Sequence, residues 1–218
     1  MRKTPFDPMS APFALPEALP FEGGRLRRLT QADLPRLRAL VDDYGLARML
    51  GGLPHPYRMG DAEAFLALVE TDWPERQNAH LVIHLDKDKV AGPGFAGVCS
   101  LFKRDAEAAD AETAREIGYW IGRPFWGKGH MTRAAEALIT WGASALTLDR
   151  IEGRALADNP GSIRVLEKLG FMATGERRRD RHPVRKVFAD MVFFVKPLAG
   201  GRSPPHTATM SQRIGYSL

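Results

Sequence analysis

The sequence has only one cysteine in 218 residues and no uninterrupted apolar run of membrane-spanning length. The single cysteine, Cys99, excludes an internal disulfide framework and is typical of a protein from the reducing cytoplasm. A transmembrane helix needs about 20 consecutive apolar residues, and the N-terminus also lacks the apolar core of a signal peptide. The six histidines are scattered, so no cysteine and histidine cluster has the spacing of metal ligands. We therefore expect a cytoplasmic protein with no membrane segment and no bound metal.

The charge balance favours an anionic partner. The formal net charge is +5 and the pI is about 9.6, so a nucleic acid and a phosphorylated cofactor are both candidate partners. Much of the excess lies in one run, Arg177, Arg178, Arg179 and Arg181. Such a run is most often a solvated loop or strand edge, and no nucleic-acid motif or array of aromatics interleaved with basic residues accompanies it. We therefore do not expect nucleic acid as the partner.

The chain is long enough for one domain with a sizeable core. Residues 1–22 carry several prolines and no helical or strand period, so we expect an extended or disordered arm. The tail from 198 to 218 is rich in Gly, Ser, Pro and Thr and is expected to be flexible. The domain is predicted to cover residues 23–197, without internal repeats.

Between these ends the sequence alternates strand and helix patterns, which predicts a mixed sheet with helices on both sides, an α/β or α+β domain. The strongest helix pattern runs from about Lys128 to Ala145, where apolar residues recur at i, i+3, i+4 and i+7. Thr30 and Asp61 suit the N-termini of two earlier helices, and Asn159 suits the start of a last one. The expected strands are 24–29, 79–85, 90–102, 114–121, 150–156, 171–178 and 184–195.

A glycine-rich turn, WGKGHM from Trp126 to Met131, lies between the strand pattern 114–121 and the strongest helix pattern. The first amides of a helix have no intrahelical partners and lie at the positive end of its dipole, so they can bind an anion. Gly127 and Gly129 would let a phosphate approach the backbone without a Cβ in the way, and Lys128 adds positive charge. The patterns of P-loop NTPases and dinucleotide-binding proteins are both absent. Taken alone, the turn is equally compatible with a phosphate cradle and with a tight strand-to-helix connection.

Several motifs in a fixed order favour the cradle. They are EIGYWIGRPFWGKGHMTRA, RIEGRAL, NPGS, and LEKLGF ahead of a strand ending in ADMVFF. This order closely resembles the GNAT superfamily (GCN5-related N-acetyltransferases), and within it the RimJ/RimL-like branch of ribosomal-protein N-terminal acetyltransferases. The loop GGLPHPY after the first helix pattern also resembles this branch, and the resemblance covers about residues 24–197. It implies a mixed, mostly antiparallel central sheet of about seven strands flanked by helices, with a splay between its two central parallel strands.

The family's pyrophosphate loop, Q/R-x-x-G-x-G/A, aligns with the stretch from Trp126 to Met131. The sequence departs from this motif at Trp126, which replaces Gln or Arg, and at Met131, which replaces Gly or Ala. Backbone amides would still hold the pyrophosphate, because this chemistry needs N–H groups rather than particular side chains. By this resemblance the residues expected to bind acetyl-CoA here are Trp126, Gly127, Lys128, Gly129, His130, Met131 and Thr132.

Transfer of an acetyl group from a thioester requires the amine to lose a proton, the carbonyl oxygen to receive a hydrogen bond and the thiolate to receive a proton. In the family the thioester lies in the splay, and a backbone amide of the first parallel strand, which we assign to Ile117, polarises the carbonyl. Glu116 is expected to be the base, directly or through water. A salt bridge of Glu116 with Arg115 or Arg133 is the structural alternative.

The NPGS motif is expected to act on the cofactor. By resemblance Asn159 bonds the pantetheine arm, a role compatible with capping the following helix. Ser162 is expected near the cofactor sulfur, where its hydroxyl would protonate or solvate the leaving thiolate. Many family members use a tyrosine four positions further on, where this sequence has Leu166.

The acceptor side is predicted less closely. His55 and Tyr57, in the GGLPHPY loop, are either specificity residues or turn packing, and Trp120 is expected to line the acceptor pocket. Cys99 is expected to be a small core residue rather than a nucleophile.

The sequence therefore predicts an acetyl-CoA-dependent N-acetyltransferase that works by direct transfer in a ternary complex. The expected acceptor is a primary amine, such as the N-terminal amine of a ribosomal protein. Two alternatives stay open: a small-molecule acetylase for an amino acid, polyamine or antibiotic, and a non-catalytic CoA-binding module. No membrane partner is expected, and a homodimer stays open.

Overall fold

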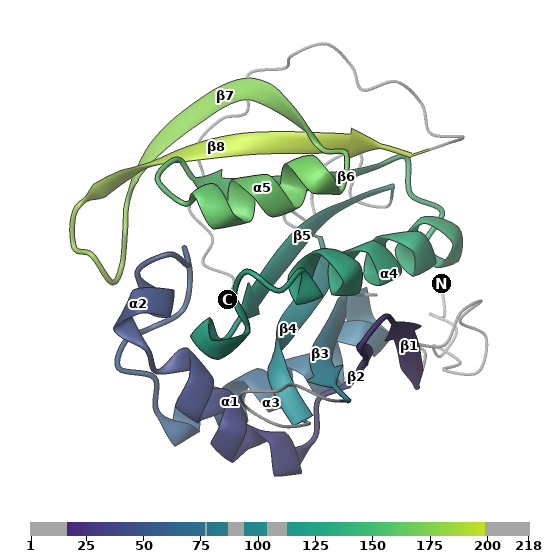
Figure 1. Ribbon diagram of the computed structural model, residues 1–218, viewed down its shortest axis with the longest axis vertical. Helices are drawn as coiled ribbons and strands as arrows, with labels where there is room; N and C mark the ends of the chain where they lie inside the picture. Colours follow the sequence, from purple (N-terminus) through teal and green to yellow (C-terminus); the bar gives the residue numbers. More distant parts are fainter. Residues whose placement is uncertain (1–16, 77, 87–93, 104–112, 199–218) are drawn as a thin grey trace, which may run out of the picture.

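The computed structural model describes residues 17–76, 78–86, 94–103 and 113–198, which form one eight-stranded sheet with helices on both faces (Figure 1). The strands are β1 (Ala18–Phe21), β2 (Gly24–Arg28), β3 (Ala79–Leu85), β4 (Gly94–Phe102), β5 (Ala114–Ile121), β6 (Arg150–Leu156), β7 (Met172–Arg181) and β8 (Phe188–Pro197). The α-helices are α1 (Leu34–Val41), α2 (Tyr44–Ala47), α3 (Met59–Arg76), α4 (His130–Ala145) and α5 (Pro160–Lys168), and the 3-10 helices are η1 (Gln31–Asp33) and η2 (Arg123–Phe125). The predicted mixed fold is confirmed.

The strand order is β1-β2-β3-β4-β5-β6-β8-β7, and neighbouring strands of this described sheet run antiparallel except for β5 and β6. This parallel pair is in register only from Ala114 beside Arg150 to Ile117 beside Gly153. Beyond that point β5 still pairs with β4, and β6 still pairs with β8, so β5 and β6 separate. The predicted splay is present, and it begins after Ile117.

Alternate residues of β5 face two different helical layers. Ile117 and Tyr119 pack with the core that lies under α4 and α5, whereas Trp120 packs with the core under α1 and α3. In Figure 1, α4 lies between β1 and α5 on the first of these faces. We call the two sides of the sheet the α4–α5 face and the α1–α3 face.

The N-terminal part adds a strand that the sequence pattern does not predict. β1 lies within the expected arm 1–22 and pairs antiparallel with β2. Its Pro20 is tolerated because β1 is the edge strand, where a residue without an N–H need not break a ladder. Residues 1–16 of the predicted arm and 199–218 of the predicted tail lie outside the described residues.

Two helices begin at positions other than those expected. α4 begins at His130 rather than near Lys128, because Gly127 and Gly129 adopt left-handed φ values of 75° and 76°. α3 begins before Asp61, whose carboxylate accepts a hydrogen bond of 2.7 Å from the N–H of Arg58. The later start of α4 leaves the amides of 127–129 in the loop ahead of the helix.

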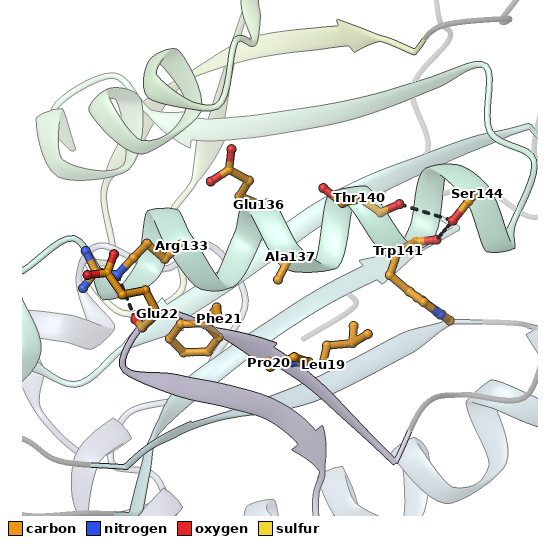
Figure 2. A pocket seen from close by; sticks show the side chains of 10 residues that line it. All are labelled: Leu19, Pro20, Phe21, Glu22, Arg133, Glu136, Ala137, Thr140, Trp141 and Ser144. Carbon is orange, nitrogen blue, oxygen red and sulfur yellow. Dashed lines mark hydrogen bonds between the residues drawn. The ribbon is translucent and has the colours of Figure 1, made fainter.

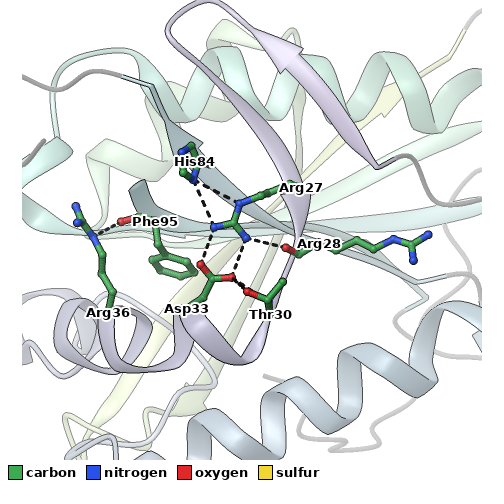
Figure 3. A network of polar contacts seen from close by, with 7 residues as sticks. All are labelled: Arg27, Arg28, Thr30, Asp33, Arg36, His84 and Phe95. Atoms are coloured by element: carbon green, nitrogen blue, oxygen red, sulfur yellow. Dashed lines mark hydrogen bonds and ion pairs between the residues drawn. The ribbon is translucent and has the colours of Figure 1, made fainter. Parts of the chain in front are cut away.

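The turn from β2 into the first helical layer is fixed by a polar network (Figure 3). Asp33 accepts hydrogen bonds from the N–H of Thr30 at 2.9 Å and from both terminal nitrogens of Arg27 at 2.7 and 2.6 Å. Burial alone would raise the pKa of Asp33, but the hydrogen bonds from Arg27 and Thr30 outweigh it and hold this pKa below its usual value. The predicted capping role of Thr30 is thus fulfilled together with Asp33.

A second polar network lies inside the α1–α3 layer. The carboxylate of Asp72 on α3 is 2.8 Å from Nε2 of His80 and accepts a hydrogen bond of 3.0 Å from Asn78. His80 Nδ1 is 3.0 Å from the Ser100 hydroxyl on β4. All four residues are buried, and their mutual hydrogen bonds offset the cost of removing them from water. The network therefore anchors α3 to β3 and β4.

The arginine run lies in β7, at one edge of the sheet. Arg178 pairs with Glu176 at 2.6 Å, and Arg179 is 3.9 Å from Asp190. Because these side chains are exposed, such pairs contribute little to stability. The run is a solvated strand edge.

Candidate active site

The turn from β5 to α4 carries the predicted phosphate cradle. After η2 the chain passes Trp126 and then the two glycines with left-handed φ before α4 begins. A Cβ added at Gly127 would meet no atom within 4 Å, so the loop surface at this residue is open. The first amides of α4 and the helix dipole favour an anion in front of them. The loop therefore leaves the backbone at Gly127 open to an anion, as the predicted cradle requires.

Side chains on both sides hold this loop in shape. The indole N–H of Trp126 donates to the carbonyl of Ile121, at the end of β5, over 2.7 Å. Arg133 on α4 donates to the carbonyl of Lys128 at 3.1 Å, and the same nitrogen is 3.1 Å from Nδ1 of His130. Because arginine only donates, Nδ1 of His130 is the acceptor in this contact. The indole nitrogen of Trp126 is thus hydrogen-bonded to the protein backbone, and its half-exposed ring lies at the edge of the cradle loop.

Glu116 lies at the closed end of the splay, on the α1–α3 face. It is 4% exposed, and its Oε1 is 2.8 Å from Nε of Arg154 on β6. The two side chains meet because Glu116 lies beside Glu152 in the parallel register, and Arg154 is two residues further along the same face. From the sequence we expect Arg115 or Arg133 as the ion-pair partner of Glu116. Arg154 could not be predicted, because the sequence alone does not give the register of β5 against β6.

Asn159 and Ser162 lie at the N-terminus of α5, on the α4–α5 face. Oδ1 of Asn159 accepts a hydrogen bond of 3.1 Å from the N–H of Ser162, which is the predicted helix cap. Its Nδ2 donates to the carbonyl of Met49 at 3.3 Å. Asn159 therefore caps α5 and also ties its N-terminus to the residues that follow α2.

Tyr119 of β5 reaches Ser162 from the opposite side of the splay. Its hydroxyl oxygen is 3.1 Å from the hydroxyl of Ser162 and 3.1 Å from the carbonyl oxygen of the same residue. Tyr119 is not among the site residues that the sequence predicts. In the sequence, the alternation of side chains along β5 indicates that Tyr119 lies on the same face of the sheet as Ile117.

Tyr119 is protonated at neutral pH. Burial raises its pKa well above the usual value, and the hydrogen bond with Ser162 acts in the opposite direction but less strongly. Burial also raises the pKa of Cys99, its neighbour across β4 and β5, to about 12. The fully buried Cys99 is therefore a neutral core thiol, as its apolar surroundings in the sequence predict.

The predicted acceptor residues lie in different surroundings. Nδ1 of His55 is 3.4 Å from the carboxylate of Asp42, and Trp120 lies on the α1–α3 face within the splayed part of β5. Tyr57 is 3% exposed, and burial raises its pKa to about 12. Contacts of His55, Tyr57 and Trp120 with an acceptor remain a prediction.

The segment around α2 connects the separated ends of β5 and β6. Oδ1 of Asp43 is 3.2 Å from Arg123, just after β5, and Met49 is bonded to Asn159, just after β6. These contacts place residues 43–49 next to the open end of the splay.

The turn between β7 and β8 is fastened to the same segment. Arg185 donates to the carbonyl of Arg48 and pairs with Asp158, both at 2.6 Å. His182 is 3% exposed, and its Nδ1 accepts hydrogen bonds of 3.2 Å from the N–H groups of Val184 and Arg185. Burial first, and then the charge of Arg185, lowers the pKa of His182. Neither Arg185 nor His182 is among the residues for which the sequence predicts a role.

Because His182 is neutral in the folded protein, we expect the protein to lose stability in acid. In the unfolded chain a histidine has a pKa near 6.5, whereas the pKa of His182 in the folded protein is lower. The stability that neutral His182 contributes is therefore complete above pH 6.5, and it is lost as the pH falls toward the pKa of the folded state. We expect the melting temperature to fall between pH 7.5 and 5.5, and to fall less in His182→Asn, whose amide oxygen can accept the same hydrogen bonds but does not titrate. Equal losses in both proteins would contradict the assignment.

A groove of about 530 Å³ lies between β1 and α4, away from the splay (Figure 2). Leu19 and Phe21 line it from β1, and Ala137 and Trp141 line it from α4. It lies on the opposite side of α4 from α5, away from Ser162. Arg133, which bonds to the carbonyl of Lys128 in the cradle loop, lines one end of this groove.

The sequence matches a family model described as an acetyltransferase (GNAT) domain over residues 25–172. "Putative ribosomal N-acetyltransferase YdaF" of Bacillus subtilis (strain 168) is 30% identical over 171 residues, which are 78% of this chain and 88% of that protein. The chain therefore belongs to the GNAT acetyltransferase family and is an acetyl-CoA-dependent N-acetyltransferase. The family predicted from the sequence is confirmed, and YdaF supports the predicted branch.

Two solved structures share this fold. The ribosomal-protein-S5-alanine acetyltransferase from Vibrio fischeri has a TM-score of 0.70 at 20% identity, over 85% of this chain and 99% of that one. The spermidine N-acetyltransferase from Vibrio cholerae, in complex with CoA and spermine, has a TM-score of 0.66 at 16% identity, over 81% of this chain and 96% of that one.

Among the described residues, no helix is long and apolar enough to cross a membrane, and no three His, Cys, Asp or Glu are grouped as metal ligands.

Proposed function

We propose that the protein acetylates the N-terminal α-amino group of a protein, with the splay between β5 and β6 as the reaction centre. In this proposal the backbone amides of residues 127–132 bind the pyrophosphate of acetyl-CoA, and Asn159 contacts the pantetheine arm. The amide of Ile117 donates to the carbonyl oxygen of the thioester, where negative charge develops. The open surface at Gly127, the register that ends at Ile117 and the cap of α5 support these assignments.

Glu116 is the proposed base. Acetyl-CoA supplies the thioester, whose C–S bond breaks as the acceptor nitrogen bonds to the acetyl carbon and the amine loses a proton. Glu116 would take this proton, directly or through water, from an acceptor that enters on the α1–α3 face. Ser162, on the other face, would hydrogen-bond the leaving thiolate.

The ion pair between Glu116 and Arg154 motivates the choice of an α-amine. Because Glu116 already has Arg154 as a partner at 2.8 Å, an acceptor that deprotonates readily makes the smallest demand on this carboxylate. An α-amino group has a pKa near 8, whereas a lysine-type amine has one near 10.4, so the α-amine needs far less help to become neutral at pH 7. The resemblance to YdaF, whose name describes a ribosomal N-acetyltransferase, supports the same acceptor.

A small-molecule amine is the second candidate acceptor. Its motivation is the shared fold with a spermidine N-acetyltransferase. Polyamine nitrogens are strongly basic, so this acceptor requires a stronger base or a higher working pH than the first one.

The test is an acetylation assay with matched acceptors. The full chain is supplied with acetyl-CoA and with a lysine-free peptide bearing a free α-amine, the same peptide blocked at the α-amine and carrying one lysine, or spermidine. Thiol release gives the rate, and mass spectrometry locates the acetyl group. We expect the free α-amine peptide to have the highest kcat/KM. A higher kcat/KM for spermidine would contradict the protein acceptor, and no turnover with any amine would contradict the proposed function.

A further inference from the structure

We propose that Tyr119 is a positioning residue for Ser162, and that the two hydroxyls together stabilise the thiolate that leaves during acetyl transfer. This inference rests on the proposed function, because it assumes that the cofactor sulfur lies beside Ser162.

The first support is the place of the two residues around the splay. Tyr119 is two residues beyond Ile117, where the pairing of β5 with β6 ends, so its strand has no β6 neighbour at this level. Ser162 belongs to the first turn of α5, which follows β6. The contact between their side chains therefore spans the splay on the α4–α5 face.

The second support is the hydrogen-bond geometry. The proton of the Tyr119 hydroxyl has two acceptors at the same distance of 3.1 Å, the carbonyl oxygen and the hydroxyl oxygen of Ser162. When Tyr119 donates to the carbonyl, the Ser162 hydroxyl can donate to Tyr119. When Ser162 turns its proton toward a thiolate, Tyr119 can donate to the Ser162 oxygen instead, so that neither of these part-buried hydroxyls loses its partner. The pair can thus change its pattern without moving heavy atoms.

The third support is that Tyr119 stays neutral. Burial keeps this hydroxyl protonated at neutral pH, and its neighbour Cys99 is a neutral thiol. Tyr119 therefore acts as a hydrogen-bond donor throughout, and no proton leaves it. Many family members have a tyrosine four residues after Ser162, where this chain has Leu166, which is 1% exposed in the core. In our proposal, the tyrosine hydroxyl beside Ser162 comes from β5 instead.

The expected effects can be measured with Tyr119→Phe, Ser162→Ala and the double variant. Tyr119→Phe keeps the ring in the core and removes only the hydroxyl. We expect kcat to fall about fivefold, the factor for loss of one neutral hydrogen bond, with the KM for acetyl-CoA unchanged. Ser162→Ala should lower kcat more, and the double variant should match Ser162→Ala, because Tyr119 acts through Ser162. Ser144→Ala, which removes a hydroxyl bonded to its own helix α4, is the control and should retain full activity.

A readout without turnover is the thiol pKa of bound CoA, followed by thiolate absorbance. A hydrogen bond to the thiolate lowers this pKa, so its loss in Ser162→Ala should raise the value by about one unit, and Tyr119→Phe should raise it by part of that amount. Unchanged turnover and unchanged thiol pKa in Tyr119→Phe would overturn the proposal, as would effects that add in the double variant. The thiol titration needs no acceptor, so it tests Tyr119 even if the wild type acetylates none of the amines offered.

Discussion

Gly127→Ala is expected to weaken acetyl-CoA binding by about 10- to 100-fold, the range for losing one charge-assisted hydrogen bond. The physical reason is local. An added Cβ at Gly127 meets no protein atom within 4 Å, so it would project from the open surface on which the proposal places the pyrophosphate. Isothermal titration with CoA measures the loss directly. Gly129 is a less clean position, because a Cβ there would lie 2.9 Å from Arg133 and disturb the loop itself.

Gly23→Ala is the matched control. Gly23 also has a positive φ, 90°, and an added Cβ there meets nothing within 4 Å, but it lies in the turn between β1 and β2. Both substitutions force an L-residue into a left-handed conformation, which costs about 1–2 kcal/mol. We therefore expect similar losses of thermal stability and a loss of CoA affinity only in Gly127→Ala. Equal affinities for CoA in the two variants would contradict the cradle.

Glu116→Gln is expected to lower kcat about 100-fold, the lower range for loss of a general base, with little change in the KM for acetyl-CoA. The amide has nearly the same shape and can still accept a hydrogen bond from Arg154, but it cannot take a proton from the acceptor. Steady-state kinetics with the free α-amine peptide measures the effect.

Glu152→Gln provides the control for this variant. Glu152 lies beside Glu116 in the parallel register of β5 and β6, and it also forms an ion pair, with Arg150 at 2.9 Å. If Glu116 serves only as an ion-pair partner, both variants should retain their turnover after correction for the folded fraction. Full turnover in Glu116→Gln would therefore contradict the base role, and a 100-fold loss in Glu152→Gln would show that the effect is not specific to Glu116.

The sequence predicts the parts of the site that depend on neighbouring residues. The glycines of the cradle and the cap of α5 by Asn159 are set by local backbone conformation, which residue type controls directly. The splay comes from the family resemblance, and the pairing of β5 with β6 confirms it. The strand β1 could not be predicted because the five prolines in 1–22 conceal a short edge strand.

The contacts that cross the sheet could not be predicted in this way. The pairs Glu116–Arg154 and Tyr119–Ser162 join residues 38 to 43 positions apart (154 − 116 and 162 − 119). Whether such side chains meet depends on the register of β5 against β6 and on where the two strands separate. A shift of one residue in that register would turn every side chain to the other face. Burial of Tyr57 likewise depends on how its loop packs against α1 and α3, which residue type alone does not determine.

A crystal structure of the full chain with CoA bound tests the central claim most directly. We expect the pyrophosphate on the backbone amides between Gly127 and Thr132, and the sulfur within hydrogen-bonding distance of the Ser162 hydroxyl, with Tyr119 still bonded to Ser162. A pyrophosphate bound away from this loop, or a sulfur outside the splay between β5 and β6, would contradict it.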